Sequence, residues 1–150
     1  MAMSSDTDIL EYFPDLYNYG IQDFSAEHAK TRGDILRRLR IEWWPRKSQA
    51  LTVDISIIGF NNTEMDESLI TESQFTRAAV FHCLAYYILP KLTQFSVDGD
   101  RFERMMTYFK SRYEEEFDAV LHDGVEYDAD ESGTITNAEK VTQHQQRLVR

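Results

Sequence analysis

The stretch TESQFTRAAVFHCLAYYILP, residues 71–90, decides the fold class of this chain. Thr71 and Gln74 have the spacing of a capping box, in which both ends of a first helical turn bond to each other. The apolar residues that follow recur at helical intervals and cover nearly the whole circumference, which is typical of a central, buried helix. Pro90 has no backbone N–H, so we expect the helix to end or kink there. The stretch therefore predicts a mainly α-helical protein.

Three more helices are predicted on either side of this one. Ser5 has the place of an N-cap for a short helix that stops near Pro14. Ser25 is expected to cap a second helix, which Pro45 ends because the residue before a proline avoids the helical conformation. A fourth helix is expected to start at the acids of residues 98–100 and to stop at Gly124. The expected architecture is a bundle of about four helices.

Gly33 lies inside the second predicted helix, where glycine is unfavourable. Gly33 costs about 1 kcal/mol relative to alanine in a helix interior. Close packing against a neighbouring element is the reason that we expect for it.

Residues 48–65 interrupt the helical pattern. Leu51, Val53 and Ile55 alternate with polar residues, which is the period of a strand. Asn61-Asn62 then gives a turn signal. We therefore expect a β-like arm over residues 51–62 that projects between helices. The predicted organisation is a helical bundle domain, residues 1–124, with the arm inserted at 48–65, followed by an extended C-terminal tail, residues 125–150.

Size and composition set bounds on the class of protein. A chain of 150 residues with 42% hydrophobic content is large enough to bury a sizeable core as one domain. No apolar run reaches the length of a membrane span, and the N-terminus lacks a signal-peptide pattern, so we expect no membrane partner. Cys83 is the single cysteine, which excludes an internal disulfide.

Charge is distributed unevenly along the chain. The net charge of −10 argues against a protein that wraps nucleic acid. Residues 30–47 are rich in bases, whereas residues 123–139 contain six acids and no base. Such asymmetry fits a subunit whose two ends meet different partners, although two solvated surfaces would look the same. Arg37 and Arg38 lie off the apolar stripe of the second helix, and Trp44 has the character of an interface anchor.

Residues 128–139, DADESGTITNAE, match the EF-hand calcium loop at every demanded position. Gly133 fills the turn position, and the ligand positions hold Asp128, Asp130, Ser132, Thr134 through its backbone carbonyl, Thr136 and Glu139. Two features oppose a signalling EF-hand: the incoming helix breaks at Gly124, and no second loop exists to pair with this one. A calcium site and a polar connector that mimics the pattern both stay open.

No set of residues predicts catalysis. The four histidines, His28, His82, His122 and His144, lack zinc-site spacing. His82 and Cys83 fall within the apolar central helix and are expected to be core residues. Since no nucleophile, base and oxyanion donor come together, we expect no enzymatic activity and no cofactor other than calcium.

Several segments resemble the head-to-tail adaptor proteins of tailed bacteriophages. They are Asp8–Phe13, Ile41–Trp44, Phe75–Ala79, Tyr86–Pro90, Tyr108–Tyr113, Glu115–Phe117 and Gly124–Asp128. Together these segments span most of the chain.

The resemblance implies a helical bundle that assembles as a ring, commonly a dodecamer of twelve subunits, beneath the portal of the capsid. The implied location is the neck of the virion, after assembly in the host cytoplasm. The implied partners are the portal protein, neighbouring adaptor subunits and a downstream tail or neck protein. DNA would pass through the channel of the ring without specific binding.

The resemblance also implies roles for two segments. The C-terminal segment of the family docks on the portal, which here corresponds to about Tyr127–Arg150, with Tyr127, Arg147 and Arg150 as interface residues. The projecting arm, 51–62, would reach neighbouring subunits or the next tail component. The leading expectation is therefore a structural virion protein, and the alternative is a calcium-binding module that uses the loop 128–139.

Overall fold

The computed structural model describes residues 2–53, 64–93 and 99–140, and of residues 50–53 the backbone alone. Within these ranges the chain is mainly helical, which confirms the predicted fold class. The described residues contain no β-strand beyond one isolated bridge. The chain divides into two compact units. Unit 1 comprises residues 1–35 and 75–119, and unit 2 comprises residues 36–74 and 120–150.

Unit 1 begins with the short helix that the sequence predicted. Helix α1 (Asp6–Tyr12) opens with a reciprocal capping box, in which the Ser5 backbone N–H donates to the Asp8 carboxylate at 2.7 Å. In return, the Asp8 N–H donates to the Ser5 hydroxyl at 3.4 Å. These two bonds satisfy donors that the first helical turn leaves open. A 3₁₀ turn, η1 (Leu16–Tyr19), follows and ends at Gly20.

The long helix α2 (Ser25–Glu42) differs from prediction at its start and at its interior glycine. Ser25 is the first helical residue rather than the cap, and its N–H donates to the Asp23 carboxylate at 3.0 Å. The hydrogen bonds from Ser25 hold the pKa of Asp23 below its ordinary value. A Cβ added at Gly33 would meet no atom within 4 Å. The expectation that close packing explains Gly33 is therefore wrong.

The end of α2 and the start of the next helix correct two further predictions. Helix α2 ends at Glu42, before Pro45, and helix α3 (Trp44–Val53) starts almost at once. Pro45 therefore opens a helix rather than ending one, since a missing N–H is tolerated in the first turn. Residues 51–53 are helical, so the predicted β-like arm does not begin at residue 51. The remainder of that arm, 54–62, lies outside the described residues.

The central helix predicted from residues 71–90 is present in four consecutive pieces, and its residues from Phe75 onward belong to unit 1. They are the 3₁₀ turn η3 (Glu72–Phe75), α4 (Thr76–Cys83), a π-helical turn η4 (Leu84–Ile88) and α5 (Leu89–Leu92). Pro90 lies in the first turn of α5, directly after the π-turn. A π-turn changes the hydrogen-bond spacing, which accommodates the missing donor without ending the helix.

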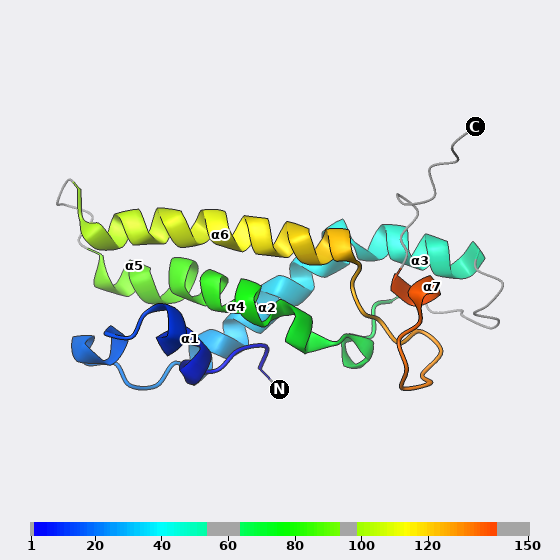
Figure 1. Ribbon diagram of the computed structural model, residues 1–150, viewed down its shortest axis with the longest axis horizontal. Helices are drawn as coiled ribbons and strands as arrows, with labels where there is room; N and C mark the ends of the chain where they lie inside the picture. The colour runs from blue at the N-terminus through cyan, green and yellow to red at the C-terminus, as the bar shows by residue number, and fades with distance from the viewer. Residues whose placement is uncertain (1, 54–63, 94–98, 141–150) are drawn as a thin grey trace. The chain divides into compact units, whose positions relative to one another are not determined.

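Helix α6 (Arg101–Asp123) runs antiparallel to this central run (Figure 1). In unit 1, Phe81 stacks on Phe109 with ring centroids 5.8 Å apart, and Phe75 contacts Phe117 at 6.2 Å. The start of α6 follows the prediction, because the Phe102 N–H donates to the Asp100 carboxylate at 3.0 Å. The apolar faces of α4 and α6 thereby form the core of unit 1.

Unit 2 consists of the end of α2, helix α3, the turn η2 (Glu67–Leu69), the end of α6 and a short helix α7 (Asn137–Lys140). Its buried apolar side chains include Trp43, Trp44, Met65, Ile70, Val125 and Tyr127. The described part of the predicted tail, residues 125–140, packs within this unit.

Candidate functional site

The acidic loop of residues 128–139 is entered by an extended segment rather than by a helix. Helix α6 ends at Asp123, and Gly124 follows it with the left-handed φ of 98° that favours glycine. The chain then forms an antiparallel bridge between Tyr127 and Ile70, with the Asp128 N–H donating to the Leu69 carbonyl at 3.0 Å. The early helix stop that the sequence indicated is confirmed, so the loop lacks the incoming helix of an EF-hand.

Gln74 holds this extended segment in place. Its side-chain N–H donates to the Gly124 carbonyl at 3.3 Å, and its side-chain oxygen accepts from the Glu126 N–H at 2.8 Å. The prediction that Gln74 closes a capping box with Thr71 is wrong, because the amide group satisfies two backbone groups of a distant segment instead.

Tyr127 anchors the entry of the loop in the core of unit 2. Its ring lies 5.9 Å from Trp43 and 5.1 Å from Trp44, centroid to centroid. Its hydroxyl accepts a hydrogen bond from the Asp66 N–H at 3.3 Å. Burial raises the pKa of Tyr127 above the ordinary value. Tyr127 and Trp44 are both buried within the chain, so neither presents an exposed side chain as an interface anchor.

Helix α7 anchors the exit of the loop. Thr136 and Glu139 form a reciprocal capping box, with the Thr136 N–H donating to the Glu139 carboxylate at 2.8 Å. Lys47, which is fully buried on α3, donates to the backbone carbonyl of Glu139. Lys140 forms an ion pair with Glu126 at 2.9 Å. Both ends of the loop are therefore fastened within unit 2.

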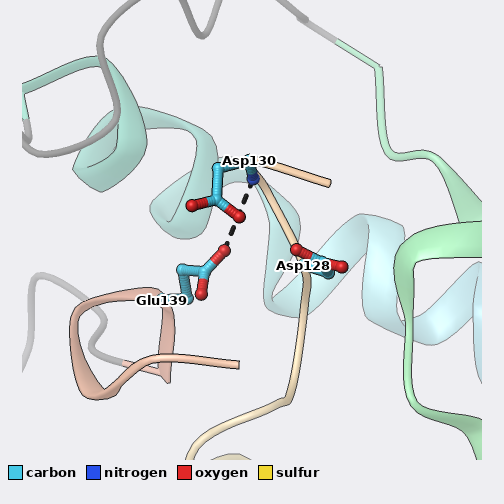
Figure 2. A group of neighbouring side chains, drawn as sticks. All are labelled: Asp128, Asp130 and Glu139. Carbon is cyan, nitrogen blue, oxygen red and sulfur yellow. Dashed lines mark hydrogen bonds between the residues drawn. The ribbon is translucent and has the colours of Figure 1, made fainter. Parts of the chain in front are cut away.

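Three carboxylates converge inside the loop (Figure 2). Asp128, Asp130 and Glu139 each offer an oxygen, and these atoms lie within 4.8 Å of one another. Asp128 accepts from the Gly133 N–H at 2.7 Å, which curls the loop around it. Hydrogen bonds from the side chain and backbone of Ser132 hold the pKa of Asp130 below its ordinary value of 3.8.

Glu139 occupies the middle of the loop and is 1% exposed. One of its oxygens accepts from the N–H groups of Ala129 at 2.8 Å and Asp130 at 3.4 Å, the second of which is the dashed line in Figure 2. The other accepts from the N–H and the hydroxyl of Thr136. Three backbone N–H groups and one hydroxyl therefore satisfy the two oxygens of this carboxylate, and a cation would have to replace several of these hydrogen bonds.

The other predicted ligands lie in the same loop. The Ser132 hydroxyl donates to the Thr134 carbonyl at 3.2 Å, and the Thr136 hydroxyl donates to Glu139. Oxygen ligands of this kind are those that Ca²⁺ takes in proteins, typically six to eight of them. The loop thus collects the donor set for a hard cation, while calcium binding itself stays a prediction.

The predicted interface arginines have different surroundings. Arg37 is exposed, and Arg38 forms an ion pair with Glu42 at 3.0 Å. Arg147 and Arg150 lie outside the described residues.

The reactive side chains of unit 1 belong to its core. His82 is buried and stacks on Tyr86 with ring centroids 4.5 Å apart, and its Nε2 lies 3.7 Å from the Asp34 carboxylate. Burial raises the pKa of Cys83 to about 12, so its thiol is protonated at neutral pH. Both residues are core residues, as the sequence indicated.

A hydrogen-bonded chain of three residues was missed by the sequence reading. The Ser4 hydroxyl lies 2.7 Å from His28 Nδ1, and His28 Nε2 lies 2.9 Å from the Asp6 carboxylate. Ser4 and His28 are buried, so this set ties the N-terminal segment to α2. No local pattern could have revealed it, because the partners are 24 and 22 residues apart.

Among the residues that the structure describes, no helix combines the length and apolarity needed to cross a bilayer. Comparison of the chain with protein-family models, with characterised proteins and with solved structures found no significant match.

Proposed function

We propose that this chain is a structural virion protein, a head-to-tail adaptor whose copies form a ring between the portal and the tail of a bacteriophage. The ring would enclose the DNA channel in the neck of the virion. The proposal starts from the resemblance of several segments to that family. The structural observation that supports it most is the aromatic cluster of Trp43, Trp44 and Tyr127.

This cluster joins two of the segments that carry the resemblance. Ile41–Trp44 and Gly124–Asp128 are far apart in the sequence, and each is a weak motif alone. In unit 2 the Tyr127 ring contacts both tryptophans, and Gly124 lies against Lys140 of α7. The two segments therefore belong to one packed core, as the proposal requires of parts of a single family fold.

The chemistry of the described side chains is compatible with a structural role. The thiol of Cys83 is buried and protonated, and the Ser4 hydroxyl is buried behind its bond to His28. A nucleophile must be accessible and activated to attack a substrate. We therefore propose no catalytic activity for these groups.

Reconstitution with the cognate portal tests this function. The purified chain, mixed with portal rings, should form complexes of higher mass that appear as stacked rings by electron microscopy. The double variant Arg147→Glu/Arg150→Glu should lose this binding if the C-terminal segment docks on the portal. Arg104→Glu, an exposed reversal on α6, is the matched control and should keep it. A wild-type chain that stays monomeric beside assembled portal would contradict the proposal.

Calcium binding is a second candidate function, favoured by the convergence of Asp128, Asp130 and Glu139 around the turn at Gly133. Because the incoming helix is replaced by an extended segment, we expect weak binding, with Kd on the order of 10⁻⁴–10⁻³ M. Bound calcium could either order the loop or serve a separate regulatory role.

Calorimetric titration with calcium decides this candidate. Glu139→Gln should abolish the heat of binding, whereas Glu131→Gln, an exposed acid in the same loop but outside the ligand positions, should preserve it. Circular dichroism of both variants controls for loss of fold. Absence of heat at millimolar calcium in the wild-type chain would remove calcium as a ligand.

A further inference from the structure

One face of α2 in unit 2 is basic and apolar at the same time. Arg37 and Ile41 are four residues apart, so they are neighbours on one side of the helix. Ile41 is 66% exposed, so it places apolar surface beside Arg37. Pro45 and Arg46, at the start of α3, are also exposed. We call these four exposed residues around the α2–α3 junction, Arg37, Ile41, Pro45 and Arg46, the basic face.

The arginines around this face differ in their pairing within the described residues. Arg40 pairs with Glu67 and Arg38 pairs with Glu42. Within the described ranges, in contrast, neither Arg37 nor Arg46 has an ion pair. Arg37 beside the exposed Ile41 matches the composition of protein interfaces, in which arginine is enriched.

The acidic loop lies on the opposite side of the same helices. Leu39 and Trp43 are each two residues from Ile41, about 200° around the helix, and both are buried. Trp43 packs on Tyr127 at the entry of the loop, and Lys47, one turn further along, holds Glu139 at its exit. A chain therefore cannot bring the loop onto its own basic face while unit 2 keeps this fold.

The tip of the loop carries negative charge that the described residues of unit 2 leave without a basic partner. Asp130 and Glu131 are exposed, and in the described part of the chain neither pairs with a lysine or arginine. Glu131 also has a left-handed φ of 55°, which turns the chain sharply at this point. Glu126, in contrast, is paired with Lys140.

We propose that the basic face of one copy of this chain binds the loop tip, Asp130 and Glu131, of a second copy. Opposite charge selects the partner, and Ile41 with Pro45 adds apolar area. Because the two surfaces are different and lie on opposite sides of unit 2, the contact is heterologous, and repeated heterologous contacts close into rings or extend into filaments. The inference rests on the proposed function, because a ring of adaptor subunits needs a heterologous contact between neighbouring copies.

A second copy is favoured over nucleic acid as the occupant. A second copy brings a small acidic tip, Asp130 and Glu131, that is opposite in charge to Arg37 and Arg46, and local complementarity of this kind selects a protein partner. Ile41 has no role in binding a phosphate backbone, whereas burial of an aliphatic side chain stabilises a protein contact.

Charge reversal with rescue tests the proposal. Sedimentation velocity of the wild-type chain at low ionic strength, from micromolar to millimolar concentration, should show reversible association that salt weakens. Arg37→Glu and Glu131→Lys should each weaken association by more than about tenfold, because like charges then meet. An equimolar mixture of the two variants, and the double variant Arg37→Glu/Glu131→Lys, should both restore it. Arg104→Glu is the matched control and should associate like the wild type.

Three outcomes would overturn the inference: a wild-type chain that stays monomeric throughout, single reversals without effect, or reversals that neither the mixture nor the double variant rescues. Binding of duplex DNA that Arg37→Glu abolishes, without self-association, would assign the face to nucleic acid instead.

The interface proposal and the adaptor proposal can fail independently of each other. If Arg37→Glu still forms rings on the portal, the interface is wrong and the adaptor function survives. If the chain self-associates as described but does not bind the portal, the adaptor function is wrong and the proposed interface still holds.

Discussion

Three glycines separate the energetic effects of backbone strain and of steric conflict. Gly33 lies in α2, in a conformation that any residue adopts, with open space where a Cβ would be. Gly133 has a φ of 76° and also faces open space. Gly124 has a φ of 98°, and a Cβ there would lie 2.9 Å from the backbone oxygen of Lys140. Substitution by alanine therefore causes neither strain nor conflict at Gly33, backbone strain alone at Gly133, and both strain and steric conflict at Gly124.

The expected changes in the free energy of unfolding follow from these differences. Gly33→Ala should stabilise the protein by about 1 kcal/mol, the difference in helix propensity. Gly133→Ala should destabilise it by about 1–2 kcal/mol, the strain of a left-handed conformation at a residue with a Cβ. Gly124→Ala should carry the same strain plus about 1–3 kcal/mol for overpacking, because α7 would have to move. The total for Gly124→Ala is a loss of about 2–5 kcal/mol.

Urea unfolding measures all three variants on one scale. Fluorescence reports on unit 2, because Trp43 and Trp44 are the two tryptophans of the chain and both pack beside Tyr127. Linear extrapolation then gives the free energy in water. If Gly124→Ala is no more destabilising than Gly133→Ala, the close approach of Gly124 to α7 is refuted. If Gly33→Ala destabilises the chain, Gly33 is packed in solution.

Other measurements check unit 1 and the aromatic cluster. The hydrogen-bonded ion pair with Lys91 holds the pKa of Glu27 below its ordinary value of 4.5. Its stabilisation should therefore be present above that pH and be lost as the pH falls through the lowered pKa. Glu27→Gln should lower the free energy of unfolding by up to about 1 kcal/mol at neutral pH and have no effect in acid; an equal loss at both would contradict this pairing. Cys83, with its pKa raised to about 12, should resist iodoacetamide in the native protein and react in denaturant, and rapid native labelling would show that the thiol is accessible. Tyr127→Phe should cost about 0.5–1.5 kcal/mol, since the hydroxyl bonds to the Asp66 N–H, and an unchanged urea midpoint would exclude that bond.

Elements governed by neighbouring residues were predictable from the sequence. The cap at Ser5, the start of α6 at Asp100 and its stop at Gly124 each depend on residues within one helical turn. The apolar period of residues 71–90 likewise predicted the central helix, because a buried helix needs apolar residues on most of its faces.

Predictions failed where one pattern permits two local structures. Pro45 can end a helix or begin one, and the tertiary structure uses it to begin α3. Alternation at residues 51–53 resembles a strand, yet these residues continue α3. Gln74 has the spacing of a capping box, but its amide group instead forms hydrogen bonds with the backbone of Gly124 and Glu126.

The loop of residues 128–139 depends both on local sequence spacing and on tertiary contacts. The sequence by itself determined its oxygen-bearing residues, its turn at Gly133 and the absence of an incoming helix, because all of these depend on local spacing. Only the tertiary structure decided that Tyr127 seats the entry against two tryptophans and that Lys47 holds the exit. Lys47 and Glu139 are 92 residues apart, and no local pattern encodes such a contact. It forms because a buried charge and a helix-end carbonyl must each find a partner.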